Sequence, residues 1–390
     1  MSPPGTSYDV VVLLGTSWEV LRDRGTRWRS VLVRWLDDRR VASLTAVDYP
    51  KFSRRAMMRP TRRLVSSAAS WKQDIRLWHA SVPAFAHRSP ADRLAWGRVA
   101  RALDGVLPAP ARRVVIAATP LWMPALLRLP AERRGFDAVD DWRGLPATAR
   151  YRSHVDAGYQ LMSHADSLTA VSGVLAARLS RDYGVREPVV IGNGVDLSLY
   201  AQDVASTLTL PDRSFAVYVG VIEERVDLDL VAQVVRALPE MPVVVAGPAA
   251  PRYGEALRRT GASWLGAVSP ADVPALLQHA AVGLVPHRVN DFTASMDPLK
   301  VLEYLAARLP VVATPVPGVA VSNRVVVAEP RDFAAAVAAA ARHGRYRDPD
   351  PRLRARDWDA VAARLLNVHL PPGVDERGGL RGRDRRAAPG

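Results

Sequence analysis

Short apolar runs alternate with amphipathic segments along most of the chain. The runs form two sets, at 8–14, 41–47, 113–118, 136–139, 168–171 and 188–191, and at 215–221, 242–246, 263–265, 281–285, 310–313 and 325–327. Helical periodicity fills gaps at 26–38, 151–164, 172–183, 227–238, 271–280, 298–308 and 332–342. Because a strand covered on both faces is apolar throughout, this alternation predicts parallel sheets. Two sets predict an α/β fold of two facing doubly wound, Rossmann-like domains with a cleft between them.

A polar segment without periodicity separates the two sets. We therefore expect a first domain at 1–198, a linker at 199–213 and a second domain at 214–370, whose last helix is 357–366. The length of 390 residues suits two domains. Residues 371–390 are rich in Arg, Gly and Asp and have little to bury, so we expect a disordered tail.

Composition excludes several classes of protein and site. The chain has no cysteine, which excludes disulfide scaffolds, cysteine metal sites and cysteine nucleophiles. The longest uncharged apolar stretches, 114–127 and 309–323, contain prolines and fall short of the roughly 20 residues that a membrane-spanning helix needs. No basic region precedes the first apolar run, so we expect no signal peptide and a cytoplasmic protein.

The net charge of +14 is unevenly distributed. Residues 1–200 hold 30 basic and 18 acidic side chains, and the basic segment 51–76 holds eight basic side chains and one acid. Such a patch favours an anionic acceptor or peripheral contact with a membrane, where Trp71, Ile75 and Trp78 would insert. A solvated arginine-rich surface with those side chains in the core is the alternative. No nucleic-acid motif accompanies the charge, so we expect no nucleic-acid partner.

Several familiar sites are absent. There is no P-loop, and Gly192 and Gly194 lack the third glycine of a dinucleotide fingerprint. The eight histidines show no metal-type spacing, and we expect no metal. The acidic pair Asp227 and Asp229 opens a helical pattern, which favours helix capping over metal binding.

The most informative segment is 295–314. Asp297 is a suitable N-cap and Pro298 suits the first helical position. A helix N-terminus attracts anions, and Lys300 adds a cation in the first turn. Glu303 lies on the same face as Lys300, where a carboxylate suits two neighbouring hydroxyls of a ribose. A capped amphipathic helix with a Lys–Glu pair explains the same residues without a ligand.

This segment and the turn 191–196 (Ile-Gly-Asn-Gly-Val-Asp) resemble the retaining GT-B glycosyltransferases of family 4, the glycosyl transferases group 1 domain. The segments 164–172, 218–225, 243–248, 264–266 and 281–286 follow in the family's order. The resemblance covers 8–314 and is specific from about residue 160 onward. Segment 136–142 resembles a subset that acts in surface-polysaccharide or secondary-metabolite glycosylation.

The resemblance implies a nucleotide-diphosphate sugar as co-substrate on the second domain and a hydroxyl acceptor, anionic or lipid-linked, on the first. Glu303 then binds the donor ribose, and the backbone at Pro298 and Leu299 contacts the diphosphate. Arg225 lies near the position of the family's diphosphate-binding basic pair. The implied donor-binding residues are Gly15, Thr16, Gly220, Gly247, Trp264, Leu265, Gly266, Pro298, Leu299 and Glu303.

The chain departs from the family pattern at four places. Ser295 stands where the family's first motif acid is expected, and 296–298 (Met-Asp-Pro) replaces Gly-Phe-Gly. Val221 replaces a phosphate-binding arginine, and Thr119 stands where many members carry a histidine. These departures keep open two alternatives: a non-catalytic GT-B partner protein and a sugar-nucleotide 2-epimerase.

The resemblance also implies a retaining, metal-independent transfer. Arg225, Lys300 and the helix N-terminus would stabilise the departing phosphate. That phosphate can take the acceptor proton in a front-face reaction, so no protein base is obligatory. If a base assists, Asp141 and His154 are candidates. A structural cap at Asp140 or Asp141 and a surface position for His154 on an amphipathic helix are the alternatives.

Overall fold

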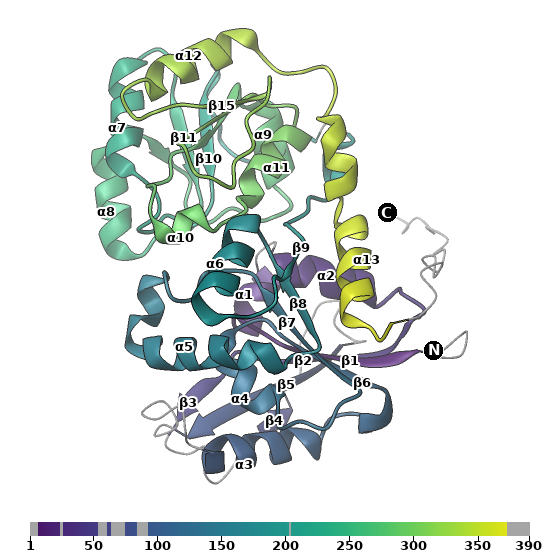
Figure 1. Ribbon diagram of the computed structural model, residues 1–390. Coiled ribbons are helices and arrows are strands. Elements are labelled where there is room, and N and C mark those ends of the chain that lie inside the picture. Colours follow the sequence, from purple (N-terminus) through teal and green to yellow (C-terminus); the bar gives the residue numbers. More distant parts are fainter. Residues whose placement is uncertain are drawn as a thin grey trace.

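Two parallel sheets with helices on both faces form two lobes (Figure 1). The computed structural model describes residues 7–23, 26–53, 61–63, 75–83, 93–202 and 204–372. The expected tail at 373–390 and most of the basic segment therefore lie outside the described residues. Within the described part of the chain, no helix is long and apolar enough to cross a membrane.

The first sheet has nine strands in the order β3-β5-β2-β1-β6-β7-β8-β9, with β4 beside β5. All neighbours are parallel except β4 and β5. The strands are β1 (Tyr8–Leu13), β2 (Val41–Val47), β3 (Lys51–Ser53), β4 (Thr61–Arg63), β5 (Ile75–Pro83), β6 (Arg113–Ala117), β7 (Arg133–Ala138), β8 (Ser167–Ala170) and β9 (Val189–Val190).

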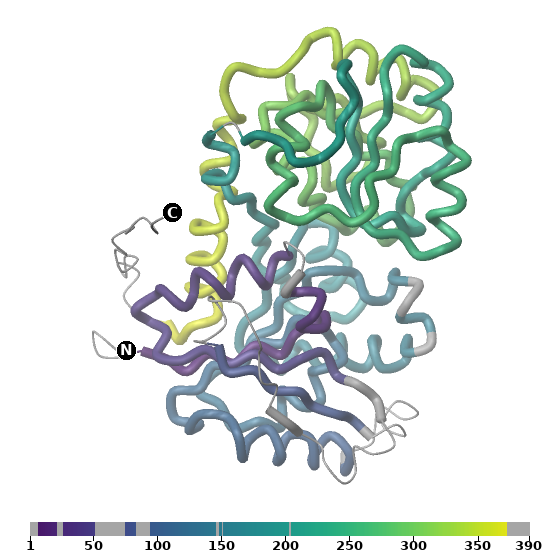
Figure 2. Tube along the Cα trace, turned by 180° about the vertical axis from the view of Figure 1, so that it is seen from behind, coloured from purple at the N-terminus to yellow at the C-terminus, as the bar shows by residue number. Residues whose placement is uncertain are grey.

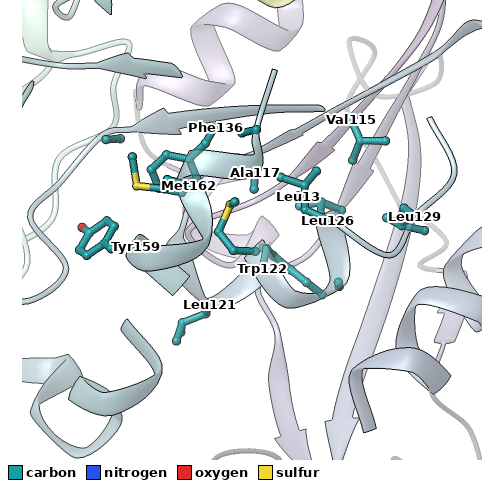
Figure 3. Close-up of a cluster of buried hydrophobic side chains, with 14 of the residues drawn as sticks. Leu13, Val115, Ala117, Leu121, Trp122, Leu126, Leu129, Phe136, Tyr159 and Met162 are labelled. Atoms are coloured by element: carbon teal, nitrogen blue, oxygen red, sulfur yellow. The ribbon is translucent and has the colours of Figure 1, made fainter. Parts of the chain in front are cut away.

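Both faces of this sheet are buried, which explains its continuous apolar strands. Along β1, Val10 and Val12 face one core, while Val11 and Leu13 face the other. Figure 3 shows the second of these cores, where Leu13 lies with Trp122 and Leu126 of the following segment. The helices of this lobe are α1 (Trp18–Asp23), α2 (Arg27–Trp35), α3 (Arg93–Asp104), α4 (Met123–Leu126), α5 (Arg152–Gln160) and α6 (Gly173–Tyr183).

The second sheet is parallel throughout, in the order β12-β11-β10-β13-β14-β15. This is the 3-2-1-4-5-6 order of a Rossmann sheet, in which the order reverses between β10 and β13. Its strands are β10 (Ala216–Val219), β11 (Val243–Ala246), β12 (Ser263–Trp264), β13 (Val282–Val285), β14 (Val311–Ala313) and β15 (Val325–Val327). Its helices are α7 (Leu228–Ala237), α8 (Pro251–Arg259), α9 (Val273–His279), α10 (Asp291–Ala294), α11 (Leu299–Ala306) and α12 (Phe333–His343).

The last helix, α13 (Trp358–His369), packs on the first lobe, beside α2 (Figures 1 and 2). Trp358 and Leu365 join the core that contains Val10, and Trp35 Nε1 donates to Ala362 O at 2.9 Å. The predicted second domain, 214–370, therefore has to be corrected: α13 packs in the first lobe. The physical reason is that the apolar stripe of α13 finds its partner surface on the other lobe.

The elements expected from periodicity are largely present, and the omissions include β5, α3 and α8. β5 pairs with β2 near one side of the first sheet, and only its first two residues fall within the basic segment 51–76. Ile75 is buried in one core and Trp78 packs partly buried against the other, so neither is free to enter a bilayer. Trp71 lies outside the described residues.

Candidate functional site

The carboxyl ends of the two sheets face each other across the lobes. Ser172, which follows β8, donates from Oγ to the carbonyl of Ser295 at 2.6 Å. Arg178 of α6 donates to the carbonyl of Asp291, at the start of α10, at 2.9 Å. Ligands of open parallel sheets bind outside the carboxyl ends, where the strand order reverses. The candidate site is therefore the part of the second lobe around β10, β13 and α11 that faces the first lobe.

The N-terminus of α11 has no side-chain cap, contrary to the expected cap by Asp297. Pro298 is the N-cap residue, and the Asp297 carboxylate instead accepts from Asn193 N at 2.5 Å and pairs with Arg356. Burial raises the pKa of Asp297, and the Arg356 charge opposes that shift. Because the Asp297 carboxylate binds Asn193 and Arg356 instead of capping α11, the first N–H groups of this helix have no side-chain acceptor.

Lys300 and Glu303 pair with each other on the first turns of α11. Lys300 Nζ lies 2.6 Å from Glu303 Oε2, and their side chains are 28% and 16% exposed. This is the pair that the sequence spacing predicts. Leu299 is half-buried and packs against cores of both lobes, while Pro298 is buried. The start of α11 is thus fixed at the boundary between the lobes.

Arg225 lies at the point where the second sheet reverses its strand order. It follows β10, pairs with Glu223 at 2.7 Å, and its side chain is 21% exposed. Its backbone carbonyl accepts from Arg288 N at 2.8 Å, and Val226 forms a bridge with His287. These contacts join the loop after β10 to the loop after β13, so Arg225 is held at the switch point.

His287 is a buried group that the sequence analysis missed. It is 6% exposed, and its Nδ1 has no hydrogen-bond partner among the described residues. Its ring lies 6.2 Å from that of Tyr218 in an edge-to-face arrangement. Burial, with the nearby Arg225 charge, lowers the pKa of His287 to about 3, so the ring is neutral at physiological pH. Its position directly after an apolar strand was the available signal.

The predicted residues beside the donor base form one unit at the carboxyl ends of β10, β11 and β12. Gly247 N donates to Gly266 O at 2.7 Å, and Trp264 Nε1 donates to Gly247 O at 2.9 Å. Gly247 has φ +147°, and a Cβ there would lie 1.8 Å from Gly220 O, so only glycine fits. The Trp264 ring packs against α8, with Arg258 stacked over it. Leu265 is half-buried beside the core.

Gly15 and Thr16 lie at the corresponding switch point of the first sheet, between β1 and β6. A Cβ at Gly15 would lie 2.5 Å from Ala118 O and 3.2 Å from the Trp142 ring. The glycine therefore permits the loop after β1 to pack closely against the end of β6. Thr119 is fully buried and caps the next turn by accepting from Leu121 N.

Of the two candidate bases, Asp141 forms an ion pair and His154 is buried. The Asp141 carboxylate pairs with Arg178 at 2.6 Å and accepts from Arg143 N at 3.1 Å. His154 is 6% exposed on α5, so its expected surface position is wrong. Ser295 is also buried and donates to Phe292 O at 2.7 Å. The contacts of Asp141 and Ser295 stabilise the chain locally and between the lobes, and a role of Asp141 or His154 in proton transfer stays a prediction.

Asp140 is a first-lobe acid on which the charge of Arg225, in the second lobe, acts. It is half-buried just after β7, and its carbonyl accepts from the Tyr159 hydroxyl at 3.2 Å. Burial raises the pKa of Asp140 to about 6, while the Arg225 charge opposes this and Glu223 adds to it. The sequence offers Asp140 and Asp141 together as structural caps and does not show that their surroundings differ.

The site lies away from two surface cavities on the second lobe. The first, of about 480 Å³, is lined by Val204, Ala205, Gln278, His279, Arg308 and Arg345. The second, of about 440 Å³, lies beside Leu238 and Met241. Neither contains a predicted donor-binding residue. Among the described residues, no cluster of His, Asp or Glu has the arrangement of a metal site.

Comparison with known proteins agrees with this geometry. Residues 213–343 match the family model described as Glycosyl transferases group 1. Sucrose-phosphate synthase from Thermosynechococcus elongatus superposes with a TM-score of 0.64 at 15% identity, over 92% of this chain and 97% of that one. The protein has the GT-B fold, and its second domain is similar to the glycosyl transferases group 1 family over residues 213–343. The sequence-based prediction of this fold is thereby confirmed.

Two further relatives are informative. A Bacillus subtilis (strain 168) protein, TuaH, named as a glycosyltransferase of teichuronic acid biosynthesis, is 27% identical over 197 residues. The match covers 45% of this chain and about half (49%) of that relative. The Anabaena protein Alr3699/HepE, solved with UDP and glucose, has a TM-score of 0.57 at 14% identity, over 93% of this chain and 95% of that one.

Proposed function

We propose that this GT-B protein is a glycosyltransferase that moves a sugar from a nucleotide-diphosphate sugar to a hydroxyl acceptor. The donor binds mainly to the second domain, and the acceptor binds to the first. We further propose a retaining, metal-independent reaction in the biosynthesis of a polysaccharide, a glycolipid or a natural product. The family of the second domain, the name of the Bacillus relative and the UDP and glucose of the Anabaena structure support this reading.

The uncapped N-terminus of α11 is the observation that carries the proposal. It lies where carboxyl ends of the two sheets face each other, and Asp297 is drawn away to Asn193 and Arg356. Free backbone N–H groups and the helix dipole favour an anion at this point. Lys300 stands in the same turn and Arg225 at the switch point, and a diphosphate would compete with Glu303 and Glu223 for these two cations.

Charge development explains how these groups would act. When the bond between the anomeric carbon and the phosphate oxygen breaks, negative charge grows on the leaving diphosphate. Arg225, Lys300 and the α11 N–H groups would stabilise that charge. The acceptor hydroxyl forms the new bond to the anomeric carbon, and its proton passes to the leaving phosphate oxygen. Glu303 would meanwhile hold the ribose hydroxyls.

A thermal-shift screen tests the proposal. The full chain is heated with UDP, GDP, ADP and dTDP, and at least one is expected to raise the melting temperature because a ligand of the folded state stabilises it. The sugar nucleotides of the best base are then incubated with the protein and hydroxyl acceptors. Transfer to an acceptor supports the proposal, whereas conversion of the donor to its 2-epimer supports the epimerase alternative. No shift with any diphosphate contradicts a donor site.

A further inference from the structure

The turn 192–194 (Gly-Asn-Gly) is anchored to the first lobe. The buried Arg27 of α2 donates to the carboxylate of Asp137, in β7, through two hydrogen bonds at 3.0 and 3.2 Å. The same guanidinium donates to Ile191 O at 2.8 Å and to Gly192 O at 2.9 Å. A buried ion pair that also binds two backbone carbonyls thus holds the turn against the sheet of the first lobe.

Together with Arg356, this turn holds Asp297 of the second lobe. Asn193 donates from its backbone N to the Asp297 carboxylate at 2.5 Å and from Nδ2 to the Asp297 carbonyl at 2.7 Å. Arg356 donates to Asn193 O at 2.6 Å and pairs with the same carboxylate. A Cβ at Gly192 would lie 2.6 Å from Asp297 Oδ2 and 2.8 Å from Arg356 Nη2, so this close approach requires glycine. We refer to Gly192, Asn193 and Arg356 as the Asp297 clasp.

Without the clasp, the local sequence favours another position for the Asp297 carboxylate. Aspartate is among the best N-cap residues and proline suits the first helical position, so α11 would begin at Pro298 and Asp297 would accept from its first N–H groups. In the structure α11 begins at Leu299 and has no side-chain cap. A capping carboxylate occupies the N–H groups that an anion would otherwise bind. The clasp and the N-cap are therefore mutually exclusive positions of one carboxylate.

We propose that the Asp297 clasp keeps the start of α11 open for the donor diphosphate by holding the Asp297 carboxylate away from the helix N–H groups. The proposal rests on the donor site proposed above and adds two positioning residues, Asn193 and Arg356, which act through Asp297. Arg356 also neutralises a negative charge that would otherwise repel the diphosphate. Because Asn193 follows β9 in the first lobe, the donor site of the second lobe depends on the docked arrangement of the two lobes. By linkage, a bound diphosphate stabilises that arrangement.

Isothermal titration calorimetry of the full chain tests the proposal. UDP, GDP, ADP and dTDP are titrated into wild type, and the tightest of them is then titrated into Arg356→Met, which removes the ion pair but keeps a long side chain. Release of the carboxylate is expected to weaken the Kd about fivefold, because the diphosphate must then displace a side-chain N-cap worth about 1 kcal/mol. An unchanged Kd in Arg356→Met overturns the proposal.

A second substitution distinguishes a released carboxylate from a weakened contact between the lobes. Asp297→Ala removes the carboxylate, so no side chain is left to cap α11 or to repel the diphosphate. Asp297→Ala and the double variant with Arg356→Met are therefore both expected to bind the diphosphate about as tightly as wild type, and more tightly than Arg356→Met alone. If the ion pair served only to hold the lobes together, both would bind as weakly as Arg356→Met, and that result overturns the proposal.

Gly192→Ala provides the same test without removing a charged residue. The added Cβ would lie against the Asp297 carboxylate and displace it from the clasp. This variant is expected to weaken the Kd as Arg356→Met does, and the Asp297→Ala change is expected to restore it. A Gly192→Ala chain that binds weakly with and without the Asp297 carboxylate overturns the proposal.

Arg354→Met is the matched control. Arg354 is exposed on the same segment, 351–356, so this variant loses the same charge as Arg356→Met and is expected to bind like wild type. An equal loss of affinity in the two variants would show a general effect of charge and overturn the proposal. If none of the diphosphates binds wild type, the proposed function fails together with this inference. Binding without the effects of the clasp variants overturns only the inference.

Discussion

The Lys300–Glu303 ion pair is compatible both with a purely structural role and with a donor-binding site. In the unliganded protein they form an ion pair at 2.6 Å on the first turns of α11. Partly exposed pairs of this kind contribute little to stability, typically less than about 1 kcal/mol. Exchanging this pair for contacts with phosphate and ribose therefore costs little. The ion pair is therefore compatible with a donor site on the first turns of α11.

The Lys300→Ala variant tests the phosphate role. Loss of the cation is expected to lower kcat/KM for the sugar nucleotide at least tenfold, which is about 1.4 kcal/mol at the transition state. Steady-state kinetics with the donor found in the screen measures this. Lys300→Arg, which keeps the charge, should retain more activity than the alanine variant. Near-normal kcat/KM in Lys300→Ala would remove Lys300 from the phosphate site.

Glu303→Ala tests the ribose role. If the carboxylate binds the ribose hydroxyls, wild type should bind a nucleoside diphosphate more tightly than its 2′-deoxy form, because the missing hydroxyl leaves a partly buried acceptor unpaired. The ratio of the two Kd values is expected to fall toward one in Glu303→Ala. Calorimetry of both ligands on both proteins gives the four constants. An unchanged ratio would place the ribose elsewhere.

The residue scale also shows where sequence reasoning ends. The Lys300–Glu303 pair depends only on helical spacing, so it was predictable. Asp140 and Asp141 are adjacent in sequence, but the Asp141 carboxylate pairs with Arg178, whereas burial raises the pKa of Asp140. Arg178 comes from another element, so no local pattern distinguishes the two acids. His287 had a local signal, its place after an apolar strand, but its burial became evident only in the structure.

At the scale of the element, tertiary contacts of Asp297 prevent the N-cap that the local sequence of α11 predicts. Asp297 followed by Pro298 has the composition of an N-cap and first helical residue, yet the helix begins one residue later. Asn193 and Arg356 offer the carboxylate stronger partners than the helix N–H groups. The Asp227 cap of α7 is confirmed, because its carboxylate accepts from Asp229 N and Leu230 N even though Arg288 lies 3.5 Å from the same oxygen.

The end of α13 makes stability depend on pH. His369 is fully buried against Ser167 and Thr169, and burial lowers its pKa from 6.5 to about 4. Between these values the unfolded chain binds a proton that the folded protein does not. The free energy of unfolding is therefore expected to fall as the pH drops from 6.5 toward 4, by up to about 1.4 kcal/mol per pH unit from this group.

Chemical denaturation at a series of pH values measures this slope. His287, whose pKa is lowered to about 3, contributes in the same direction, so His369→Gln should flatten the slope without abolishing it. His343→Gln is the matched control, because His343 is exposed at the end of α12 and should leave the slope unchanged. An unchanged slope in His369→Gln would mean that His369 does not control the pH response.

At the scale of the whole molecule, the chain crosses between the lobes twice. It leaves the first lobe near 201–213 and returns with α13, which completes the core beside α2. Arg356, just before α13, contacts Asp297 and Asn193, and these contacts hold the returning segment in place. The lobes are therefore joined by two connections, and the return segment is a structural part of the first lobe.

Truncation tests this dependence. A chain that stops after Asp357 lacks Trp358 and Leu365 and leaves an apolar surface beside α2 exposed. We expect this chain to aggregate or to melt at a much lower temperature than wild type, since deleting even one large buried side chain costs about 3–5 kcal/mol. A chain that stops after Pro372 is the control and should melt like wild type. Equal melting temperatures would show that α13 is dispensable.

The sequence by itself determined the fold class, the two sheets, most helices and the Lys300–Glu303 pair. These depend on apolar runs, helical periodicity and short spacings, which act over a few residues. Only the tertiary structure decided that α13 belongs to the first lobe, that Asp297 bridges the lobes, and that Arg225 lies beside Arg288 of the loop after β13. Each of these depends on a partner more than 50 residues away in sequence, and such partners are chosen by the packing of surfaces and charges that only the folded chain brings together.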